Sequence, residues 1–362
     1  MMKKLAYLLL GSFLAPTLAI SGGIERSELP TSFMYENNNY IEVTMINRNF
    51  EINDNMFAPS RSMFDDVSSL HFAAKFDVGE NLDIGVARYN QAGASHNYQG
   101  AGSPIPGFSA VGPKVDLNIN ALSFLGRYSF QDFSAIGGVK VSTVADATAD
   151  IFKLSGATSA ASVQGESDTG LIAGVAYQIP DIALRVELLY EAETSFTLST
   201  TGGLLGTATA NTTASLPDYR TLNFQSGIAK DTLLYGSIRT ADWSNHQIAV
   251  APQTQAAPTS NFSDSTTYTI GVGRKISDEL SLSVSYKTEE ATDNTGTSLL
   301  TPTDGYSAIG AAVVYTFAGG TKITLGANYS NVGDKTVTTS GVSGAFTDNT
   351  VVTTGLKIAH NF

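Results

Sequence analysis

Four histidines are the side chains in this 362-residue sequence that most readily take part in metal or acid–base chemistry. His71, His96, His246 and His360 are scattered, and no pair has the spacing of metal ligands. The absence of cysteine excludes disulfides, thiol catalysis and thiolate metal sites. A Ser-His or Asp-His site could assemble in space, but no G-x-S-x-G, H-E-x-x-H or P-loop motif selects one. We therefore expect no enzyme activity, no catalytic residue, no metal site and no cofactor.

The charge and composition limit the possible partners. The net charge is -12 and the isoelectric point is near 4.7, which argues against nucleic acid because phosphate binding needs clustered Lys and Arg. Charged residues make up only 15% of the chain, below the usual share of about 25% in soluble proteins. The polar surface must come from Ser, Thr, Asn, Gln and 34 Gly, a mixture that suits turns and neutral polar faces.

The first residues have the pattern of a secretory signal peptide. "MMKKLAYLLLGSFLAPTLA" contains two lysines, an apolar run from Leu5 to Leu14, and small residues at Thr17 and Ala19. We expect residues 1–19 to be removed after Ala19, or cleavage after Ser21. A membrane anchor is the alternative, but the apolar run is too short to span about 30 Å of hydrocarbon.

From residue 40 onward, the sequence divides into segments of about ten residues with alternating hydrophobicity, the pattern of an outer-membrane barrel. We predict an all-β fold, a transmembrane antiparallel β-barrel of about 14 strands over residues 40–362. The predicted strands are Tyr40 to Phe50, Val67 to Asp77, Asn81 to Asn90, Val115 to Phe130, Phe133 to Val144, Thr169 to Gln178, Ile182 to Phe196, Tyr219 to Ile228, Thr232 to Trp243, Thr266 to Lys275, Glu279 to Glu289, Gly305 to Phe317, Thr321 to Asn331 and Thr350 to Phe362.

Short and long connections alternate between these segments. The short ones are "DVGEN", "FQDFS", "QIPDI", "IAKDT", "KISDEL" and "FAGGT". A transmembrane barrel has tight periplasmic turns at one end and long loops outside, whereas a soluble sandwich has no reason to sort its loops by length. With an even number of strands, both termini are then expected in the periplasm.

The two faces of the strands predict which residues line the barrel. In "DIALRVELLYE" the apolar residues alternate with Arg185, Glu187 and Glu191, and Glu193 continues the same parity. A charge on the lipid face costs about 2–4 kcal/mol at the midplane, so ionised residues should point inward. The predicted lumen-lining residues are Lys140, Arg185, Glu187, Arg239, Lys287 and Lys357. An aromatic girdle is expected from Tyr128, Tyr190, Tyr235, Tyr286, Tyr315 and Tyr329.

The alternation breaks in two strands. "VDLNINALSFLGRY" changes parity after Ile119, and "NLDIGVARYNQAG" places Arg88 on the apolar face. A β-bulge restores the faces after such a slip and is common at functional sites, so we expect a bulge in each strand. Glycines follow the second slip at Gly93, Gly100 and Gly102. The alternative is that Arg88 lies above the membrane.

The segment before the first strand, residues 20–39, is a candidate N-terminal plug. Barrels of sixteen to eighteen strands enclose an aqueous channel and eight-stranded barrels are filled, so fourteen strands leave room for a ligand or a plug. A disordered periplasmic tail is the alternative.

Several stretches resemble the FadL-type long-chain fatty acid and hydrocarbon transporters of Gram-negative outer membranes. These are "GGIERS" with "FMYENNNYIEV", the run "LPDYRTLNFQSGIAKDTLLYGSIRTADWS", "DGYSAIGAAVVYTF" and the terminal Phe362. The resemblance covers nearly the whole mature chain. It implies fourteen strands, an N-terminal hatch, capture of a hydrophobic ligand by extracellular loops, and lateral release through a gap at a kinked third strand. With the slip and the glycines in the third strand, this makes Arg88 and Gly93 the candidates for the lateral exit.

Apolar residues in the long loops are the candidate ligand contacts, because exposed apolar groups there suit capture of a hydrophobic molecule. They are Ile105, Phe108, Ile151, Phe152, Leu154, Leu204 and Leu205. Packing of the loops onto one another is the alternative explanation. Lys153 or Arg239 could pair with a carboxylate head group.

Together these features predict an outer-membrane transporter for hydrophobic compounds such as long-chain fatty acids. The alternative is a general diffusion porin for small polar solutes. The expected partners are the hydrophobic ligand, outer-membrane lipid and, through Phe362, the barrel assembly machinery.

Overall fold

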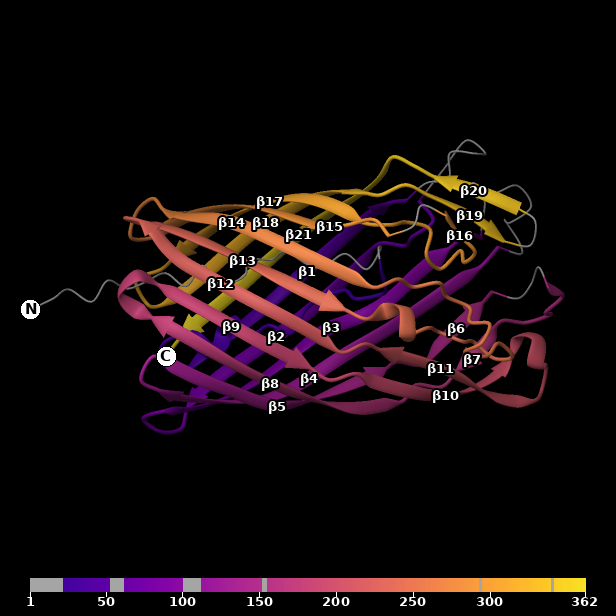
Figure 1. Ribbon diagram of the computed structural model, residues 1–362, viewed down its shortest axis with the longest axis horizontal. Coiled ribbons are helices and arrows are strands. Elements are labelled where there is room, and N and C mark those ends of the chain that lie inside the picture. Colours follow the sequence, from indigo (N-terminus) through magenta and orange to yellow (C-terminus); the bar gives the residue numbers. More distant parts are fainter. Residues whose placement is uncertain (1–21, 53–61, 100–111, 152–154, 293–294, 340–341) are drawn as a thin grey trace, which may run out of the picture.

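The computed structural model describes residues 22–52, 62–99, 112–151, 155–292, 295–339 and 342–362. Within these ranges, fourteen long antiparallel strands form a closed barrel, as the sequence pattern predicts. Short turns lie at one end of the barrel and longer connections at the other (Figure 1). The predicted signal peptide lies outside the described residues.

The barrel closes because the last strand pairs with the first, from Tyr40 opposite Asn361 to Glu51 opposite Thr350. The wall strands are β1 (Tyr40–Glu51), β2 (Val67–Asp77), β3 (Leu82–Asn97), β4 (Lys114–Phe130), β5 (Phe133–Val144), β8 (Ser167–Ile179), β9 (Leu184–Glu191), β12 (Tyr219–Ala229), β13 (Thr232–Ala241), β14 (Ser265–Lys275), β15 (Leu280–Glu289), β17 (Tyr306–Thr316), β18 (Thr321–Val332) and β21 (Asn349–Asn361).

The long connections contain further structure that the sequence analysis treated as loops. Four short strands extend the wall: β6 (Ala147–Asp150), β7 (Ala161–Val163), β10 (Thr194–Gly202) and β11 (Thr209–Leu216). A separate small sheet contains β16 (Thr295–Gly296), β19 (Lys335–Thr339) and β20 (Val342–Phe346). The 3₁₀ turns are η1 (Ser32–Tyr35), η4 (Pro180–Ile182), η5 (Gly203–Leu205) and η6 (Trp243–Asn245). No described helix is long and apolar enough to cross a membrane.

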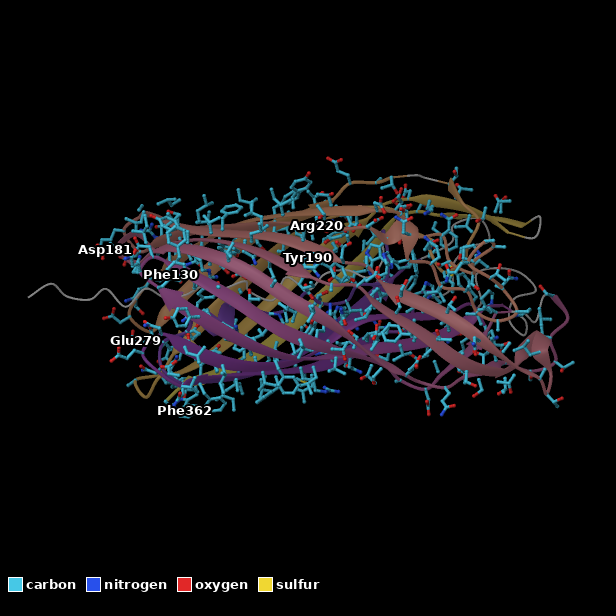
Figure 2. All side chains as sticks on the ribbon, turned by 60° about the horizontal axis from the view of Figure 1, so that its bottom comes forward. Phe130, Asp181, Tyr190, Arg220, Glu279 and Phe362 are labelled. Atoms are coloured by element: carbon cyan, nitrogen blue, oxygen red, sulfur yellow. The ribbon has the colours of Figure 1, made fainter. Side chains whose placement is uncertain are left out.

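The alternating pattern sorts side chains as expected along most of the wall. On β15, Leu282, Val284 and Tyr286 are exposed on the outer face, whereas Ser283 and Lys287 are buried inside. Figure 2 shows apolar side chains covering the outside, with Phe130 and Phe362 at the short-turn end. The ring of Phe362 packs edge-on against Phe76 of β2 at a centroid distance of 6.4 Å. The outer surface therefore has the apolar character that a lipid environment requires.

The prediction of a bulge in the fourth strand is wrong. β4 keeps a continuous register with β5 from Ile119 opposite Val144 to Phe130 opposite Phe133. Val115, Leu117 and Ile119 are buried on the inner face, the same face as Leu125. The parity change in the sequence arises because the interior itself is apolar near the long connections, and not because the strand slips.

Two residues lie on the opposite face from the one predicted. Tyr235 was expected in the aromatic girdle, but it is 8% exposed and points inward, on the same parity as Arg239. Glu193 was expected inside, but its side chain is 63% exposed. β9 ends at Glu191 and β10 begins at Thr194, so the chain changes face at this break.

The outer face yields a prediction for the strength of the lipid constraint. Val284 is 61% exposed at the middle of β15, opposite Val272 of β14. We expect Val284→Arg to lower the free energy of unfolding from lipid vesicles by about 2–4 kcal/mol, because the charge lies at midplane depth. Ile276→Arg is the control, since Ile276 is equally exposed but lies in the turn after β14, where about 0–1 kcal/mol is expected. Equal losses for both variants in a denaturant titration would contradict this placement of the membrane.

Candidate functional site

Residues 22–39, called here the hatch segment, lie inside the barrel. Ile24, Leu29, Phe33 and Met34 of this segment are all buried. An isolated β-bridge joins Glu25 to Ala92 of β3. The short η1 turn places Phe33 and Met34 against β3, where a Cβ atom built on Gly85 would come within 2.2 Å of the Met34 sulfur. The hatch segment therefore occupies the lumen that fourteen strands leave open.

Three ion pairs hold the hatch segment to the wall, and each has the acid on the hatch. Glu25 contacts Arg239 of β13 at 2.5 Å, Glu28 contacts Lys287 of β15 at 2.8 Å, and Glu36 contacts Lys322 of β18 at 2.9 Å. Buried ion pairs contribute little net stability, but breaking one leaves an uncompensated charge that is expensive. These ion pairs fix the position of the hatch segment, and that position depends on the ionisation of the paired groups.

The first two hatch acids, Glu25 and Glu28, differ in their electrostatic surroundings. Burial raises the pKa of Glu25, and the pairing with Arg239 opposes this only in part. Burial also acts on Glu28, but Lys287 and Arg239 outweigh it and hold the pKa of that carboxyl below its usual value. Protonation would therefore weaken the Glu25 contact first as the pH falls.

Aromatic and hydroxyl contacts hold the part of the hatch segment nearer the short turns. The guanidinium groups of Arg185 and Arg127 lie 4.1 Å and 4.7 Å from the ring centre of Tyr35, distances at which cations are attracted to aromatic rings. The hydroxyl of Thr31 donates to Glu187 at 2.8 Å. These contacts attach the hatch segment to β4 and β9.

The inner wall carries its own charge network. Glu191 accepts from Lys140 at 3.1 Å and from Arg239 at 3.0 Å, and all three side chains are buried. Arg239 also lies 4.1 Å from the ring centre of Tyr219. Lys357 pairs with Glu42 at 3.2 Å. The structure places the predicted lumen-lining residues on the inner face: Lys140, Arg185, Glu187, Arg239, Lys287 and Lys357.

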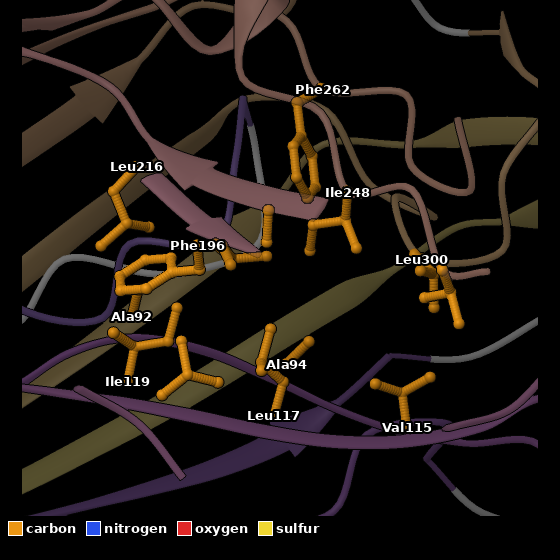
Figure 3. Close-up of a cluster of buried hydrophobic side chains, with 14 of the residues drawn as sticks. Ala92, Ala94, Val115, Leu117, Ile119, Phe196, Leu216, Ile248, Phe262 and Leu300 are labelled. Carbon is orange, nitrogen blue, oxygen red and sulfur yellow. The ribbon is translucent and has the colours of Figure 1, made fainter. Parts of the chain in front are cut away.

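An apolar cluster fills the interior at the long-connection end (Figure 3). It brings together β3, β4, β10, β11 and the loops after β13 and β15, and it reaches Ile24 of the hatch segment. Its large members are Leu117, Ile119, Phe196, Leu198, Leu216, Tyr219, Trp243, Ile248, Phe262 and Leu300. Burial of each large apolar side chain stabilises the fold by about 1.5–3 kcal/mol. The cluster therefore forms an apolar layer directly above the charged layer.

Trp243 joins this apolar cluster to the hatch segment. Its indole packs edge-on against Phe262 and Tyr219, with centroid distances of 5.5 Å and 6.3 Å. A Cβ atom built on Gly23 would lie 2.2 Å from the indole, so only glycine allows this close approach. The run "LPDYRTLNFQSGIAKDTLLYGSIRTADWS" contains this tryptophan near its end, so it marks the place where the hatch segment meets the wall.

The loop residues that were predicted to contact ligand lie in different environments. Ile151 packs against the apolar cluster, Leu204 is exposed on the outside, and Leu205 is half-buried. Ile105, Phe108, Phe152 and Leu154 lie outside the described residues. Sequence reasoning missed Phe196, Leu216, Trp243, Ile248 and Phe262. In the sequence, the available signal for an apolar interior was the set of apolar residues at the odd-numbered positions of β4.

The third strand separates from β2 at the predicted kink, while it stays paired with β4. β3 pairs with β2 only from Asp83 to Arg88, and its register against β4 shifts between Asn90 and Ala92. A bulge at Gln91 therefore confirms the irregularity expected in this strand. Beyond it, residues 67–71 of β2 pair with β1 but with no residue of β3.

Side chains span the resulting opening between β2 and β3. Arg88 remains on the outer face and donates to the carbonyl of Leu70 at 3.3 Å. The backbone N–H of Asn90 donates to the Nε2 atom of His71 at 3.3 Å. On the inner side, the N–H of Gly93 donates to the carbonyl of Ile24 at 2.9 Å. The hatch segment thus lies directly behind the opening.

A luminal cavity of about 170 Å³ lies beside the hatch segment. Its lining includes the charged residues Glu28, Glu42, Arg185, Arg239, Lys287 and Lys357. His71 and Phe72 of β2 also line it, which brings the cavity to the strand that borders the opening. Within the described residues, no group of three or more His, Asp or Glu side chains is arranged to hold a metal ion.

The sequence matches no protein-family model and no curated protein. Its structure is similar to that of a Pseudomonas aeruginosa FadL homologue, with 13% identity, a TM-score of 0.70, and 92% of each chain covered. It is also similar to the Pseudomonas putida toluene transporter TodX (12% identity, TM-score 0.59, 96% and 98% covered) and the Ralstonia pickettii toluene transporter TbuX (11%, 0.60, 92% and 92%). At these identities the similarity establishes architecture. The fold of this chain is that of the FadL-type transporters.

Proposed function

We propose that this protein is an outer-membrane transporter for uptake of hydrophobic compounds such as long-chain fatty acids. The observation that carries the proposal is the arrangement of three neighbouring features: the apolar cluster, the hatch segment and the opening between β2 and β3. Structures of the same fold come from a FadL homologue and from toluene transporters. The orientation follows that of other barrels, with the short turns and both termini in the periplasm.

Capture of the ligand is proposed at the long-connection end. The apolar cluster gathers aromatic and aliphatic side chains, the residue types that line most sites for small apolar molecules. Ile151 extends this surface into a loop. The cluster meets the hatch segment at Ile24, so a bound ligand would come to lie against the segment that fills the lumen.

Release is proposed sideways into the membrane, through the opening between β2 and β3. Below the apolar cluster, the lumen is lined by buried ions, including Lys140, Glu191 and Arg239. An apolar chain gains about 0.8 kcal/mol for each CH₂ that leaves water, and the ionic layer offers no such environment. The opening beside His71 and Gly93 is the proposed route to hydrocarbon that avoids the ionic layer.

A general diffusion porin would need a continuous polar bore. The hatch segment and its ion pairs with Arg239, Lys287 and Lys322 occupy the lumen instead, which favours the transporter. Outer-membrane lipid, and the assembly machinery acting through Phe362, are the proposed further partners.

Uptake by cells is the direct test of this function. Cells that make the protein are expected to take up a labelled long-chain fatty acid or alkane faster than cells that lack it, because the barrel replaces diffusion across a polar outer leaflet. An unrelated outer-membrane barrel protein, present in equal amounts in both kinds of cell, is the control. Equal uptake would remove this class of ligand from consideration.

Substitution at the opening tests lateral release. A Cβ atom on Gly93 would lie 2.3 Å from the carbonyl of Leu117 and 2.6 Å from the guanidinium of Arg26. We expect Gly93→Val to slow uptake several-fold, with the barrel still folded by heat-modifiable electrophoretic mobility. Gly137→Val on β5 is the control, because a Cβ atom there meets nothing within 4 Å. Normal uptake by a folded Gly93→Val protein would argue against an exit at this place.

Neutralising the hatch acids tests whether the segment closes the lumen. The double variant Glu25→Gln, Glu28→Gln removes both negative partners of Arg239 and Lys287 on the hatch segment. In planar bilayers, we expect a small conductance for the native protein and a larger or more frequent open state for the variant. Asp278→Asn, which removes an exposed acid paired with Lys275, should behave as native. A large steady current through the native protein would instead favour the porin.

A further inference from the structure

The backbone pairing between β2 and β3 is interrupted at the opening and resumes beyond it. Toward the short turns, the paired part ends with Phe72 opposite Arg88. Toward the long connections, the chain just before β2 meets the end of β3, and the N–H of Asp65 donates to the carbonyl of Ser95 at 2.9 Å. The opening is therefore bounded at both ends by paired backbone.

The two sides of the opening contain the same number of residues. Between these two paired positions lie residues 66–71 on the β2 side and residues 89–94 on the β3 side. Residues of antiparallel strands face each other one to one, and an extra residue on one strand makes a bulge. Because the numbers match, β2 and β3 can pair across the opening without a net shift of register.

The hatch segment takes the place of β2 beside this part of β3. The N–H groups of Arg26 and Ser27 donate to the carbonyl of Gln91, at 2.7 Å and 3.2 Å. The N–H of Gly93 donates to the carbonyl of Ile24 at 2.9 Å. These hatch residues run antiparallel to β3, and an isolated β-bridge joins the two. At the opening, β3 thus has β4 on one side and the hatch segment on the other.

Two arginine side chains strengthen this substitution. The guanidinium of Arg26 donates to the hydroxyl of Ser95 on β3 at 2.7 Å and to the side-chain oxygen of Asn118 on β4 at 3.0 Å. Arg48 of β1 donates to the carbonyl of Arg26 at 2.7 Å and to the hydroxyl of Ser69 on β2 at 3.4 Å. The hatch residues are thus bonded to β3 directly, whereas Arg48 mediates their contact with this part of β2.

Departure of the hatch segment would leave backbone groups of β3 without partners. The carbonyl of Gln91 and the N–H of Gly93 would lose their hydrogen bonds in a wall that lipid surrounds. A backbone group that is buried away from water and unpaired costs about as much free energy as a lost hydrogen bond. Pairing of β3 with another strand would therefore lower the free energy once the hatch segment has left.

The adjoining edge of β2 can supply that pairing. Residues 67–71 pair with β1 but with no residue of β3. The contacts that now cross the opening involve side chains: Arg88 donates to the carbonyl of Leu70, and the ring of His71 accepts from the N–H of Asn90. Both contacts can be exchanged for backbone pairs by rotation of a side chain. A continuous ladder between β2 and β3 is thus the alternative to the present arrangement.

We propose that residues 24–27 of the hatch segment act as a removable strand that holds β3 away from β2. The opening exists while these residues are seated, and it closes by pairing of β3 with β2 when they leave. This coupling follows from backbone pairing, whereas its role in uptake rests on the proposed transport function. The lumen and the opening in the wall are then never open together, and removal of the hatch segment slows lateral release.

The absence of cysteine allows a disulfide test of this coupling in the full chain, in outer membranes. Ser69→Cys is combined with Gln91→Cys in one protein and with Ala92→Cys in another, because the bulge leaves two residues of β3 that could face Ser69. A disulfide needs Cα atoms about 4.4–6.8 Å apart, the spacing of paired strands. Ala74→Cys with Val86→Cys is the positive control, since these residues already face each other. Alkylation of free thiols and mass spectrometry measure the rate of oxidation.

Two changes to the hatch segment are each combined with these cysteine pairs. One is deletion of residues 24–31, and the other is Gly23→Val, whose Cβ atom would lie 2.2 Å from the indole of Trp243. We expect the disulfide across the opening to form about tenfold faster or more in both, because backbone hydrogen bonds no longer hold β3 away. Glu36→Gln, which removes the charge paired with Lys322 at the other end of the segment, is the matched control and should oxidise at the native rate.

The oxidation rates test the coupling, and uptake tests the function. Equal rates in the native hatch and the altered ones would overturn the coupling and leave transport standing. So would the absence of the disulfide in both altered proteins, folded by heat-modifiable mobility, while the control pair oxidises. With the coupling in place, the deletion should slow uptake of a labelled fatty acid several-fold. Faster uptake by a deletion protein that forms the disulfide would retain the coupling and count against lateral release.

Discussion

A strand that lies in a membrane needs a hydrogen-bonded neighbour on each side, and the architecture of this protein depends on that requirement. The pairing of β1 with β21 meets it for the barrel as a whole. Residues 67–71 of β2 are where the requirement is relaxed, because β3 turns inward after Arg88. The Arg88 guanidinium and the His71 ring take up backbone groups there. The wall is therefore held at this place by side chains, which can exchange partners, and not by a continuous ladder.

The interior consists of two layers with different physical character. Trp243, Phe262 and their neighbours make an apolar layer near the long connections, and Glu191, Lys140 and Arg239 make an ionic layer below it. Tyr219 lies at the boundary, with its ring edge-on to Trp243 and its face toward Arg239. The hatch segment crosses this boundary within two residues, since Ile24 belongs to the apolar layer and Glu25 to the ionic one. An amphiphile presents the same sequence of surfaces.

The sequence predicts the wall well because lipid imposes one rule on every strand. Leu282 and Val284 alternate with Ser283 and Lys287, and the lengths of the connections distinguish the two ends. The rule fails where the interior is also apolar. On β4, an inward Leu117 then looks like an outward residue, so a bulge was expected where none exists. The bulge of β3 was detectable because a charged residue and apolar residues occupy alternating positions of the same parity in that strand.

The candidate site was less predictable, because its parts come from distant places in the sequence. Arg26 and Arg48 belong to different elements, and no local spacing indicates that Arg26 contacts β3 and that Arg48 contacts the hatch segment. The cluster around Trp243 depends on short strands such as β10 and β11, which form only as additions to an existing wall. Alternation over eight or nine residues in a long connection is too weak to distinguish such strands from loops.

The polarity of the hatch pairs bears on the order in which the barrel assembles. Glu25, Glu28 and Glu36 meet bases that lie 214, 259 and 286 residues further along the chain. Contacts of such long sequence separation form late, because the intervening chain must be ordered first. Until then Arg239 keeps Glu191 of the wall as an acidic partner, whereas Lys287 and Lys322 lack the hatch carboxylates that they contact in the folded protein. The hatch segment thus supplies counter-ions to Arg239, Lys287 and Lys322, and these three bases have their full set of acidic contacts only when the segment lies in the lumen.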